Sequence, residues 1–303
     1  INFAMKIFRR EILDFLELKC EGSFINGEFL IKALRLGYKI KEVEVEYFPR
    51  RYGISRLCSI SVICKIIYEM VKLFPELRFF SKEKVLYRKT RRLYKDAGLK
   101  VMLHNLIRYK TCPFNKIRKL LPYKGQFLDL GCGYGFFSNL IAIENKERRV
   151  LGVDIDMDKI KIALTAAAGN PYIDFKNDDL SSPDFRLSST YDCITLLDVL
   201  YLLPYPQQER VLKYCFDRLS LRGILILKEI RTRPLLKYII SVIQETISVK
   251  ILRLTKARTG RFYFRAEESY AKLLKDIGFN INILRSDRGY LYPHIIFLAR
   301  KSV

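Results

Sequence analysis

From about residue 120 onward, the hydrophobic positions alternate between short runs typical of strands and longer periodic stretches typical of helices. Seven strand-like runs occur there, and they are "GQFLDL", "RRVLGVDI", "YIDFKND", "YDCITLLD", "GILILKEI", "FNINILRS" and "PHIIFLARK". Apolar runs that alternate with helices are typical of a mostly parallel sheet with helices on both faces. The pattern therefore predicts an α/β doubly wound sheet that finishes in a hairpin-like pair of strands.

The first 122 residues follow a different pattern. Residues 86–122 are basic and helical in pattern, with breaks at Pro113 and Pro122, which predicts a helical connector that caps the sheet. Residues 1–85 have their own periodicity, and no internal repeat links them to the rest of the chain. We therefore expect three parts, over residues 1–85, 86–122 and 123–303.

A glycine-rich turn follows the first strand-like run, in "FLDLGCGYGFF" at residues 127–137. Gly131, Gly133 and Gly135 stand at every second position, which allows a tight strand-to-helix turn with exposed amides. Such a turn could hold the pyrophosphate of a dinucleotide, the parts of S-adenosylmethionine, or no ligand at all. The glycines alone do not choose between these ligands.

Three acidic residues narrow the choice of ligand for this loop. Asp129 precedes the glycines, where a carboxylate would repel a phosphate and attract a cationic amine. Asp154 ends the second strand-like run, at the position from which an acid binds ribose hydroxyls, and Asp179 follows the third run, where it can take an adenine amino group. Acids at three consecutive strand ends would form one rim, so we expect an adenosine-containing ligand.

The motifs "FLDLGCGYGFFS", "VLGVDID", "FKNDDL", "YDCITLLDVLYLLP" and "LSLRGILILKEI" resemble, in order, those of class I S-adenosylmethionine-dependent methyltransferases. The resemblance covers roughly residues 120–303 and implies a Rossmann-like methyltransferase sheet with S-adenosylmethionine as cofactor. It places the methionine part at the glycine loop, the ribose at Asp154, the adenine at Asp179, and Leu197 beside the pocket. The implied cofactor residues are Asp129, Gly131, Cys132, Gly133, Gly135, Asp154, Ile155, Asp179, Leu180 and Leu197.

The catalytic residue is left open by the sequence. Transfer of a methyl group from a sulfonium depends mainly on positioning the acceptor, so no recognisable acid or base is required. Asp198, Tyr201 and His294, with Tyr292, are candidates for the acceptor pocket, and packing in the core is the alternative for each. No metal site is predicted, because the seven cysteines are scattered, which also favours a reduced, cytosolic chain.

Residues 1–85 contain a second resemblance. "GSFINGEFLIKALRLGYKIKEVEVEYFPRRYGISRL" is similar to the C-terminal third of family 2 glycosyltransferases of the dolichyl-phosphate mannose synthase type. The similarity implies a small α/β remnant in which Arg50, Ser55 and Arg56 lie near a lipid phosphate. Glu44 replaces the usual proline of the preceding strand, and the nucleotide-sugar half with its Asp-x-Asp motif is missing. We therefore expect no sugar transfer from this piece.

The charge distribution bears on partners. The net charge is +23, yet residues 127–230 carry 12 basic against 15 acidic side chains, so the excess lies in the flanks. Basic flanks would attract anionic lipid, a phosphorylated lipid carrier or nucleic acid, unless they are simply a solvated surface. Two amphipathic stripes, at residues 63–74 and 236–254, could lie at a membrane interface or pack on a core.

Together these observations favour a cytoplasmic methyltransferase, with a peripheral location at a membrane as an option, that acts on a small-molecule or lipid-linked acceptor. The alternatives are an RNA methyltransferase that uses the basic flanks, a fragment of a bifunctional glycosyltransferase-methyltransferase, and a scaffold without catalysis. Nucleic acid is the weaker partner, because no dedicated RNA-binding module is visible. The chain begins at Ile1, so the native start could lie upstream.

Overall fold

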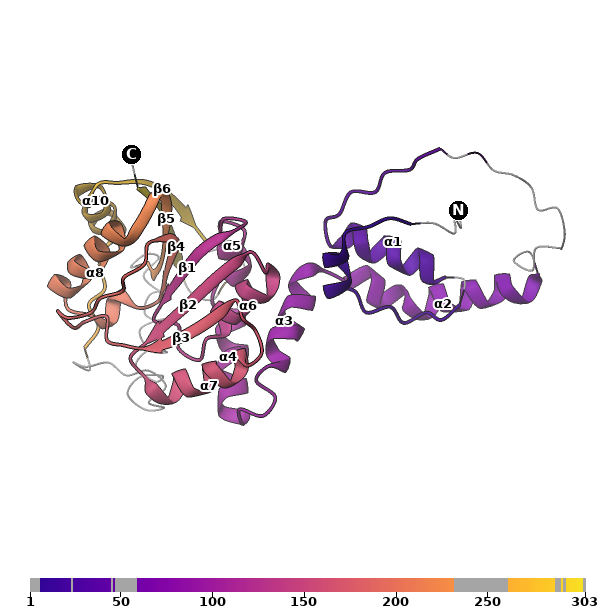
Figure 1. Cartoon of the computed structure of the whole chain (residues 1–303), viewed down its shortest axis with the longest axis horizontal. Helices are drawn as coiled ribbons and strands as arrows, with labels where there is room; N and C mark the ends of the chain where they lie inside the picture. The colour runs from indigo at the N-terminus through magenta and orange to yellow at the C-terminus, as the bar shows by residue number, and fades with distance from the viewer. Residues whose placement is uncertain are drawn as a thin grey trace. The chain divides into compact units, whose positions relative to one another are not determined.

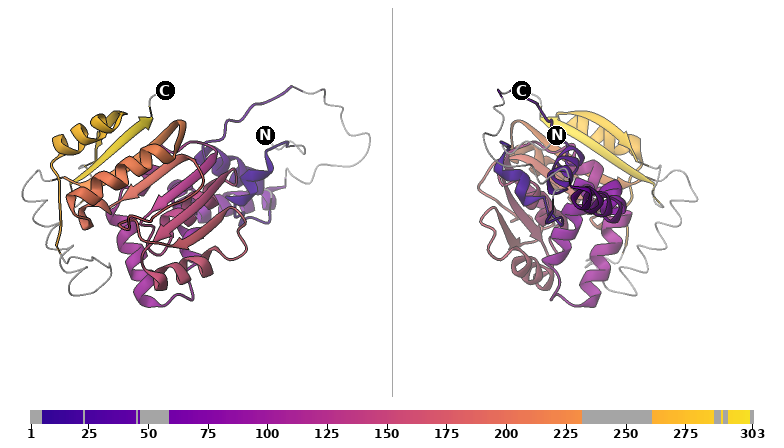
Figure 2. Two further views of the ribbon diagram at one scale, coloured as in Figure 1. Left: turned by 60° about the vertical axis from the view of Figure 1, so that its left-hand side comes forward. Right: turned by 90° about the vertical axis from the view of Figure 1, so that its right-hand side faces the viewer.

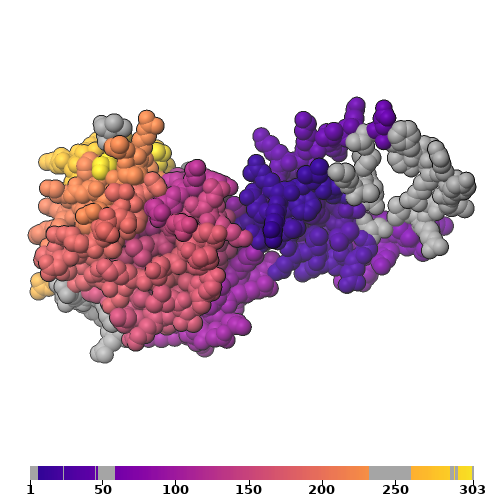
Figure 3. Space-filling view, viewed as in Figure 1, coloured from indigo at the N-terminus to yellow at the C-terminus, as the bar shows by residue number. Residues whose placement is uncertain are grey.

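The computed structural model describes residues 6–22, 24–44, 46, 59–231, 261–286, 290 and 293–301. The chain divides into two compact units, Ile1–Arg88 and Lys89–Val303. In Figures 1 and 3 the first unit runs from indigo to purple and the second continues through magenta and orange to yellow. Each unit is described below by itself.

The described part of the first unit is helical. It contains η1 (Arg10–Asp14), α1 (Ile25–Arg35) and α2 (Ile60–Phe79), and it ends within α3 (Lys82–Arg92). A small core joins α1 to α2 around Cys20, Leu73 and Leu77. Glu28 and Lys32 of α1 form a fully buried ion pair at 2.5 Å, and the same carboxylate accepts two backbone amides. The extra hydrogen bonds offset part of the cost of burying both charges.

The strand expected around Glu44 is not formed in the described residues of this unit, so its expected α/β character is not seen there. A strand is stable only when another strand pairs with it, and the described residues of the first unit supply none. The three positions assigned to a lipid phosphate, Arg50, Ser55 and Arg56, lie outside the described residues.

The second unit contains the seven-stranded sheet that the sequence predicts. The strands are β1 (Gly125–Leu130), β2 (Arg148–Asp154), β3 (Ile173–Asn177), β4 (Tyr191–Leu197), β5 (Leu219–Ile230), β6 (Phe279–Arg285) and β7 (His294–Lys301). Their order is β3-β2-β1-β4-β5-β7-β6, and β7 runs antiparallel to both of its neighbours. The predicted parallel sheet with a final antiparallel pair is confirmed.

Helices lie on both faces of this sheet (Figures 1 and 2). The segment before β1 forms α4 (Leu99–Thr111) and α5 (Phe114–Arg118), and the connections form α6 (Phe136–Glu144), α7 (Met157–Ala167), η3 (Leu200–Leu202), α8 (Tyr205–Arg218) and α10 (Glu267–Ile277). Helices α8 and α10 share one core cluster with the strands, and α7 packs on β3 in another. The sheet is therefore covered as the doubly wound pattern requires.

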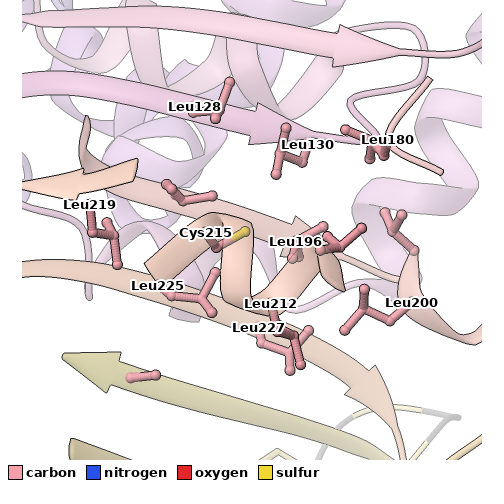
Figure 4. Close-up of a cluster of buried hydrophobic side chains, with 14 of the residues drawn as sticks. Leu128, Leu130, Leu180, Leu196, Leu200, Leu212, Cys215, Leu219, Leu225 and Leu227 are labelled. Atoms are coloured by element: carbon pink, nitrogen blue, oxygen red, sulfur yellow. The ribbon is translucent and has the colours of Figure 1, made fainter. Parts of the chain in front are cut away.

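The main core lies between the sheet and α8. Leu128 and Leu130 are two residues apart in β1, so both point to the same face of the sheet, where they meet Leu196 of β4 and Leu212 of α8 (Figure 4). Asp129 lies between the two leucines and therefore points to the opposite face. This alternation decides what the acid can contact.

The strand order reverses beside β1, which pairs with β2 on one side and with β4 on the other. The connections from β1 and β2 leave in one direction along the sheet, and the connection from β4 leaves in the other. A crevice at the carboxyl ends of the strands is expected at such a switch point. The glycine loop lies there, directly after β1.

Candidate functional site

The glycine loop needs its glycines for two different reasons. Gly131, Gly133 and Gly135 have φ values of 76°, 57° and 71°, a region in which other residues are strained. A Cβ on Gly131 would lie 2.4 Å from Val199 Cγ2, and one on Gly135 would lie 2.5 Å from the ring of Phe175. A Cβ on Gly133 would meet nothing within 4 Å. Two glycines therefore permit close packing, and the third borders open space.

The amides of the loop donate inward. The N–H groups of Gly131 and Cys132 donate to the carbonyl oxygen of Val153, at 2.7 and 3.1 Å, and that of Gly133 donates to Asp154 Oδ2 at 2.8 Å. A pyrophosphate in a dinucleotide site is held by amides that point toward the ligand. Three consecutive amides are engaged within this protein, so this loop is unsuited to that mode of binding.

Asp154 ends β2 and is half-buried. Its two carboxylate oxygens accept the backbone amides of Gly133 and Asp156, the second at 2.9 Å. Each oxygen keeps acceptor capacity, since a carboxylate can accept about four hydrogen bonds. Ile155 follows and is 37% exposed, an apolar side chain next to the acid. The assignment of Asp154 to the ribose and of Ile155 to the cofactor stays a prediction.

Asp129 is assigned by the sequence to the methionine part of the cofactor, and this assignment stays a prediction. The side chain is buried, and its two oxygens accept hydrogen bonds from Ser138 Oγ of α6 at 2.5 Å and Thr195 Oγ1 of β4 at 2.7 Å. Burial raises the pKa of Asp129, and the two hydroxyls lower it less. The acid therefore joins β1 to α6 and β4 and supports the loop from beneath.

Asp179 and Leu180, assigned to the adenine, lie beyond β3. One oxygen of Asp179 accepts the amide and the hydroxyl of Ser181, at 2.8 and 2.6 Å, so the carboxylate stabilises a turn. Leu180 is buried in the main core cluster. The assignment of both residues to the cofactor stays a prediction, and the structure adds a packing role for each.

Asp198 follows β4 with a left-handed backbone, φ 63°, and its side chain is buried. The carboxylate accepts a hydrogen bond from Arg108 Nη1 of α4 at 2.5 Å and forms an ion pair with Lys228 Nζ of β5. Arg108 Nη2 also donates to the carbonyl oxygen of Leu197 at 3.1 Å. Two cations from separate elements therefore fix the end of β4.

This network decides the protonation of Asp198. Burial alone would raise the pKa of Asp198, but the charges of Lys228 and Arg108 outweigh it and lower the pKa. A carboxylate so stabilised is a weak base. Asp198 is thus better suited to hold the backbone at the carboxyl end of β4 than to remove a proton from an acceptor.

The other two candidates are packed. Tyr201 is buried and stacks on Phe264, with ring centroids 5.0 Å apart. His294 is buried at the start of β7, and its Nε2 lies 2.6 Å from the carbonyl oxygen of Thr111. Burial, assisted by the charge of Lys228, lowers the pKa of His294 to about 3, so the ring is neutral at neutral pH. Tyr292 lies outside the described residues.

Glu229 is a functional candidate that the sequence patterns did not single out. It follows Lys228 in β5 and is buried, and its Oε1 accepts the amide of Leu200 at 3.0 Å. Burial, together with the negative charge of Asp198, raises the pKa of Glu229 to about 8. A visible signal existed, because "LKEI" inserts two charges into an otherwise apolar strand. Arg108 had no such signal within its basic segment.

The comparisons with known proteins agree with this geometry. The order of the seven strands, with the glycine loop directly after β1, is that of a class I methyltransferase domain, which uses S-adenosylmethionine. The family described as "Methyltransferase domain" matches residues 102–282, more than half of the chain. The chain belongs to this family. The predicted class of enzyme and its cofactor are thereby confirmed for the domain.

Individual relatives are distant. Over 126 aligned positions, this chain is 28% identical to the mitochondrial ubiquinone biosynthesis O-methyltransferase of Saccharomyces cerevisiae. The alignment covers 41% of this chain and 39% of that protein. The alignment thus spans well under half of that curated relative. An O-methyltransferase family protein of Burkholderia thailandensis has a similar structure, with a TM-score of 0.52 and 13% identity over 79% of this chain and 71% of that one.

A further solved structure is magnesium protoporphyrin IX methyltransferase of Synechocystis, crystallised with bound SAH. It has a TM-score of 0.49 and 23% identity, and the alignment covers 71% of this chain and 94% of that chain. In the described residues of the present chain, no helix has the length and apolar character needed to cross a membrane.

Proposed function

We propose that the protein transfers a methyl group from S-adenosylmethionine to a small-molecule acceptor at the carboxyl ends of β1, β2 and β4. One observation carries the proposal. Asp154 holds the amide of Gly133 with one oxygen and keeps acceptor capacity for hydroxyls, beside a loop position that is open where a side chain would stand. The engaged loop amides support this donor over a dinucleotide.

The chain's own residues have three tasks in this proposal. Asp154 accepts hydrogen bonds from the ribose, Ile155 covers one side of the base, and Gly133 leaves space at the loop. The donor supplies an electrophilic methyl group and a neutral leaving group. The protein therefore needs to orient the acceptor, which the rigid segment after β4 can do.

Support for a small-molecule acceptor comes from several directions. The curated relative is named for ubiquinone biosynthesis and the Synechocystis structure for magnesium protoporphyrin IX, and both names denote small molecules. Asp198 is held by two cations and is unsuited to proton removal. We therefore propose that the acceptor presents a nucleophile that ionises readily or loses its proton to water.

The proposal extends to the kind of acceptor and to the origin of the three parts of the chain. We propose that the acceptor is a small molecule or a lipid-linked compound, and that residues 1–85 derive from a family 2 glycosyltransferase, with a connector at 86–122 and the catalytic domain at 123–303. The family match begins at residue 102, so it leaves residues 1–85 to the sequence resemblance. RNA methylation through the basic flanks is the alternative.

Titration calorimetry on the full chain tests the donor site. S-Adenosylmethionine and its demethylated product should bind, and NAD should not. Asp154→Ala should weaken cofactor binding by about 1.5–3 kcal/mol, the range for hydrogen bonds to a charged group. Asp158→Ala is the matched control, because this acid of α7 is largely exposed and close in sequence. Tight NAD binding, or equal cofactor affinity in both variants, would contradict the proposal.

A further inference from the structure

His104 of α4 has a ring nitrogen without a partner. Its Nδ1 is buried and makes no hydrogen bond to any of the described residues. The neighbouring side chain of Asn105 does not fill this role, because its Nδ2 is buried without a hydrogen-bond partner as well. A buried polar atom left unpaired costs free energy, so native structures pair such atoms with protein, water or ligand. The nitrogen of His104 therefore needs a partner that the described residues do not supply.

The imidazole of His104 lies against the glycine loop. Its ring centre is 5.1 Å from that of Tyr134, and the two rings meet edge to face at 73°. The carbonyl oxygen of Tyr134 accepts the hydroxyl of Tyr94 at 2.8 Å, which ties the loop to the segment before α4. Tyr134 directly follows Gly133, on which a Cβ would meet nothing within 4 Å. The imidazole thus contacts the neighbour of the loop position that borders open space.

The same helix reaches the end of β4. One turn after His104, Arg108 donates to the carboxylate of Asp198 and to the carbonyl oxygen of Leu197. β4 pairs with one edge of β1, and β2, which ends in Asp154, pairs with the other edge. α4 therefore contacts the glycine loop and the β4 side of the crevice. A ligand that binds Asp154 and crosses the loop would reach α4 with its other end.

The ring of His104 is neutral. Burial lowers the pKa of His104 to about 4, the charges of Arg108 and Lys159 lower it further, and the side chain of Asn105 raises it less. A neutral imidazole has one N–H and one lone pair, so it can donate or accept a hydrogen bond. A base with so low a pKa removes protons poorly at neutral pH. A role in binding therefore suits His104 better than a role as general base.

We propose that His104 binds the amino-acid end of S-adenosylmethionine through a hydrogen bond to Nδ1. The inference rests on the proposed function, which assigns the ribose to Asp154. The adenosine part then lies toward β2, and the amino-acid part is the end that crosses the loop toward α4. The carboxylate of that end would accept the N–H of Nδ1, or its ammonium would donate to the lone pair. An ordered water in place of the ligand is the alternative.

Calorimetry on the full chain with two ligands tests this contact. S-Adenosylhomocysteine, the demethylated product, has the amino-acid end, and methylthioadenosine has the same adenosine part without it. His104→Phe keeps an aromatic ring against Tyr134 and removes both nitrogens. It should weaken binding of S-adenosylhomocysteine by about threefold to tenfold, the range for one hydrogen bond, and leave binding of methylthioadenosine unchanged.

A third ligand separates the two groups of the amino-acid end. Decarboxylated S-adenosylmethionine keeps the ammonium and lacks the carboxylate. Equal affinity of this ligand for His104→Phe and the unmodified chain would identify the carboxylate as the partner of Nδ1. Weaker binding to the variant would identify the ammonium. Either result supports the contact once His104→Phe has weakened S-adenosylhomocysteine alone.

Two variants serve as controls for this comparison. Leu103→Phe adds the same ring to α4 at a position that is 53% exposed, and should change neither affinity. Asp154→Ala should weaken S-adenosylhomocysteine and methylthioadenosine alike, because both contain the ribose. General damage to the site also weakens both ligands. A change in the ratio of the two affinities therefore reports the contact with the amino-acid end.

The unmodified chain offers a test without any substitution. NMR of imidazole nitrogens is simple to assign here, because the chain has only two histidines. S-Adenosylhomocysteine should shift the Nδ1 signal of His104, and methylthioadenosine should shift it much less. His294 is the internal reference, since its Nε2 lies 2.6 Å from the carbonyl oxygen of Thr111. If His104→Phe does not fold, this measurement decides.

The outcomes separate the contact from the proposed function. Equal effects of His104→Phe on the two ligands, or equal Nδ1 shifts with both, would overturn the contact and leave water as the partner of Nδ1. If Asp154→Ala still weakens both ligands in that case, the proposed function stands. An unmodified chain that binds neither ligand would contradict the proposed function and the contact together.

Discussion

Glu229 makes the stability of the fold depend on pH. Burial, and next the charge of Asp198, raise the pKa of Glu229 from an ordinary value of 4.5 to about 8. Between these values the folded chain keeps a proton on this carboxyl, and the unfolded chain releases it. Since the folded state then binds more protons, the free energy of unfolding falls as the pH rises. Above pH 8 this contribution is lost.

The informative change is Glu229→Gln, which keeps an oxygen to accept the amide of Leu200 and cannot ionise. For a single group with these two pKa values, linkage gives a loss of about 2 kcal/mol between pH 6 and pH 8. The variant lacks this loss. Its stability relative to the unmodified chain should therefore rise by about 2 kcal/mol across that interval.

Two buried histidines change the free energy of unfolding with pH in the opposite direction. Burial lowers the pKa of His294 to about 3 and that of His104 to about 4, so the unfolded chain binds these protons first. Their contribution to stability is present above the unfolded pKa of about 6.5 and is lost progressively as the pH falls toward the folded values of about 3 and 4. Both histidines are present in the unmodified chain and in Glu229→Gln. The difference between the free energies of unfolding of these two proteins therefore does not contain the effect of the histidines.

Denaturant unfolding at fixed ionic strength and several pH values measures this difference. Glu268→Gln, an exposed acid of α10, supplies the baseline for losing a carboxylate without burial. If the free energies of unfolding of Glu229→Gln and the unmodified chain differ by the same amount at every pH from 6 to 8, the raised pKa of Glu229 is refuted. It would mean that the carboxyl of Glu229 reaches water or another cation in solution.

Two further changes test the packing of the site. Asp198→Asn leaves the charges of Lys228 and Arg108 uncompensated, and should lower the free energy of unfolding by about 3–5 kcal/mol. Denaturant unfolding measures this loss. A loss below about 1 kcal/mol would show that water reaches the two cations. Gly131→Ala should cost at least about 1–2 kcal/mol from its left-handed backbone. Val199→Ala should relieve part of the added clash, and a cost unchanged in that background would contradict the 2.4 Å approach.

The sheet could be predicted from local pattern, and the reason is physical. Central strands covered on both faces, such as β4, are apolar along most of their length, and the edge strands β3 and β6 alternate, so all seven stood out between helical periods. The strand expected around Glu44 in the first unit had another source, because it was implied by the resemblance to family 2 glycosyltransferases. A strand also needs a neighbour, and pairing is a property of the whole chain. Local pattern carries no information on that point.

The site was predicted in part for a similar reason. Glycines and a strand-end acid mark a loop locally, so the hydrogen bond from Gly133 to Asp154 joins two residues that the sequence singles out. The partners of Asp129 are Ser138, nine residues later, and Thr195, 66 residues later on another strand. Which of them an acid reaches depends on the face to which it points and on the strand order. The two hydroxyls that Asp129 contacts therefore leave no local pattern in the sequence.

The segment after β4 depends most on distant residues. Arg108 lies 90 positions before Asp198 and Lys228 lies 30 after it, and both contact the carboxylate of this left-handed residue. Glu229, the next residue in β5, points to the other face and holds the amide of Leu200. Adjacent residues of one strand thus restrain this segment from both faces of the sheet. A segment restrained in this way can orient an acceptor without a catalytic base, which is what methyl transfer from a sulfonium demands.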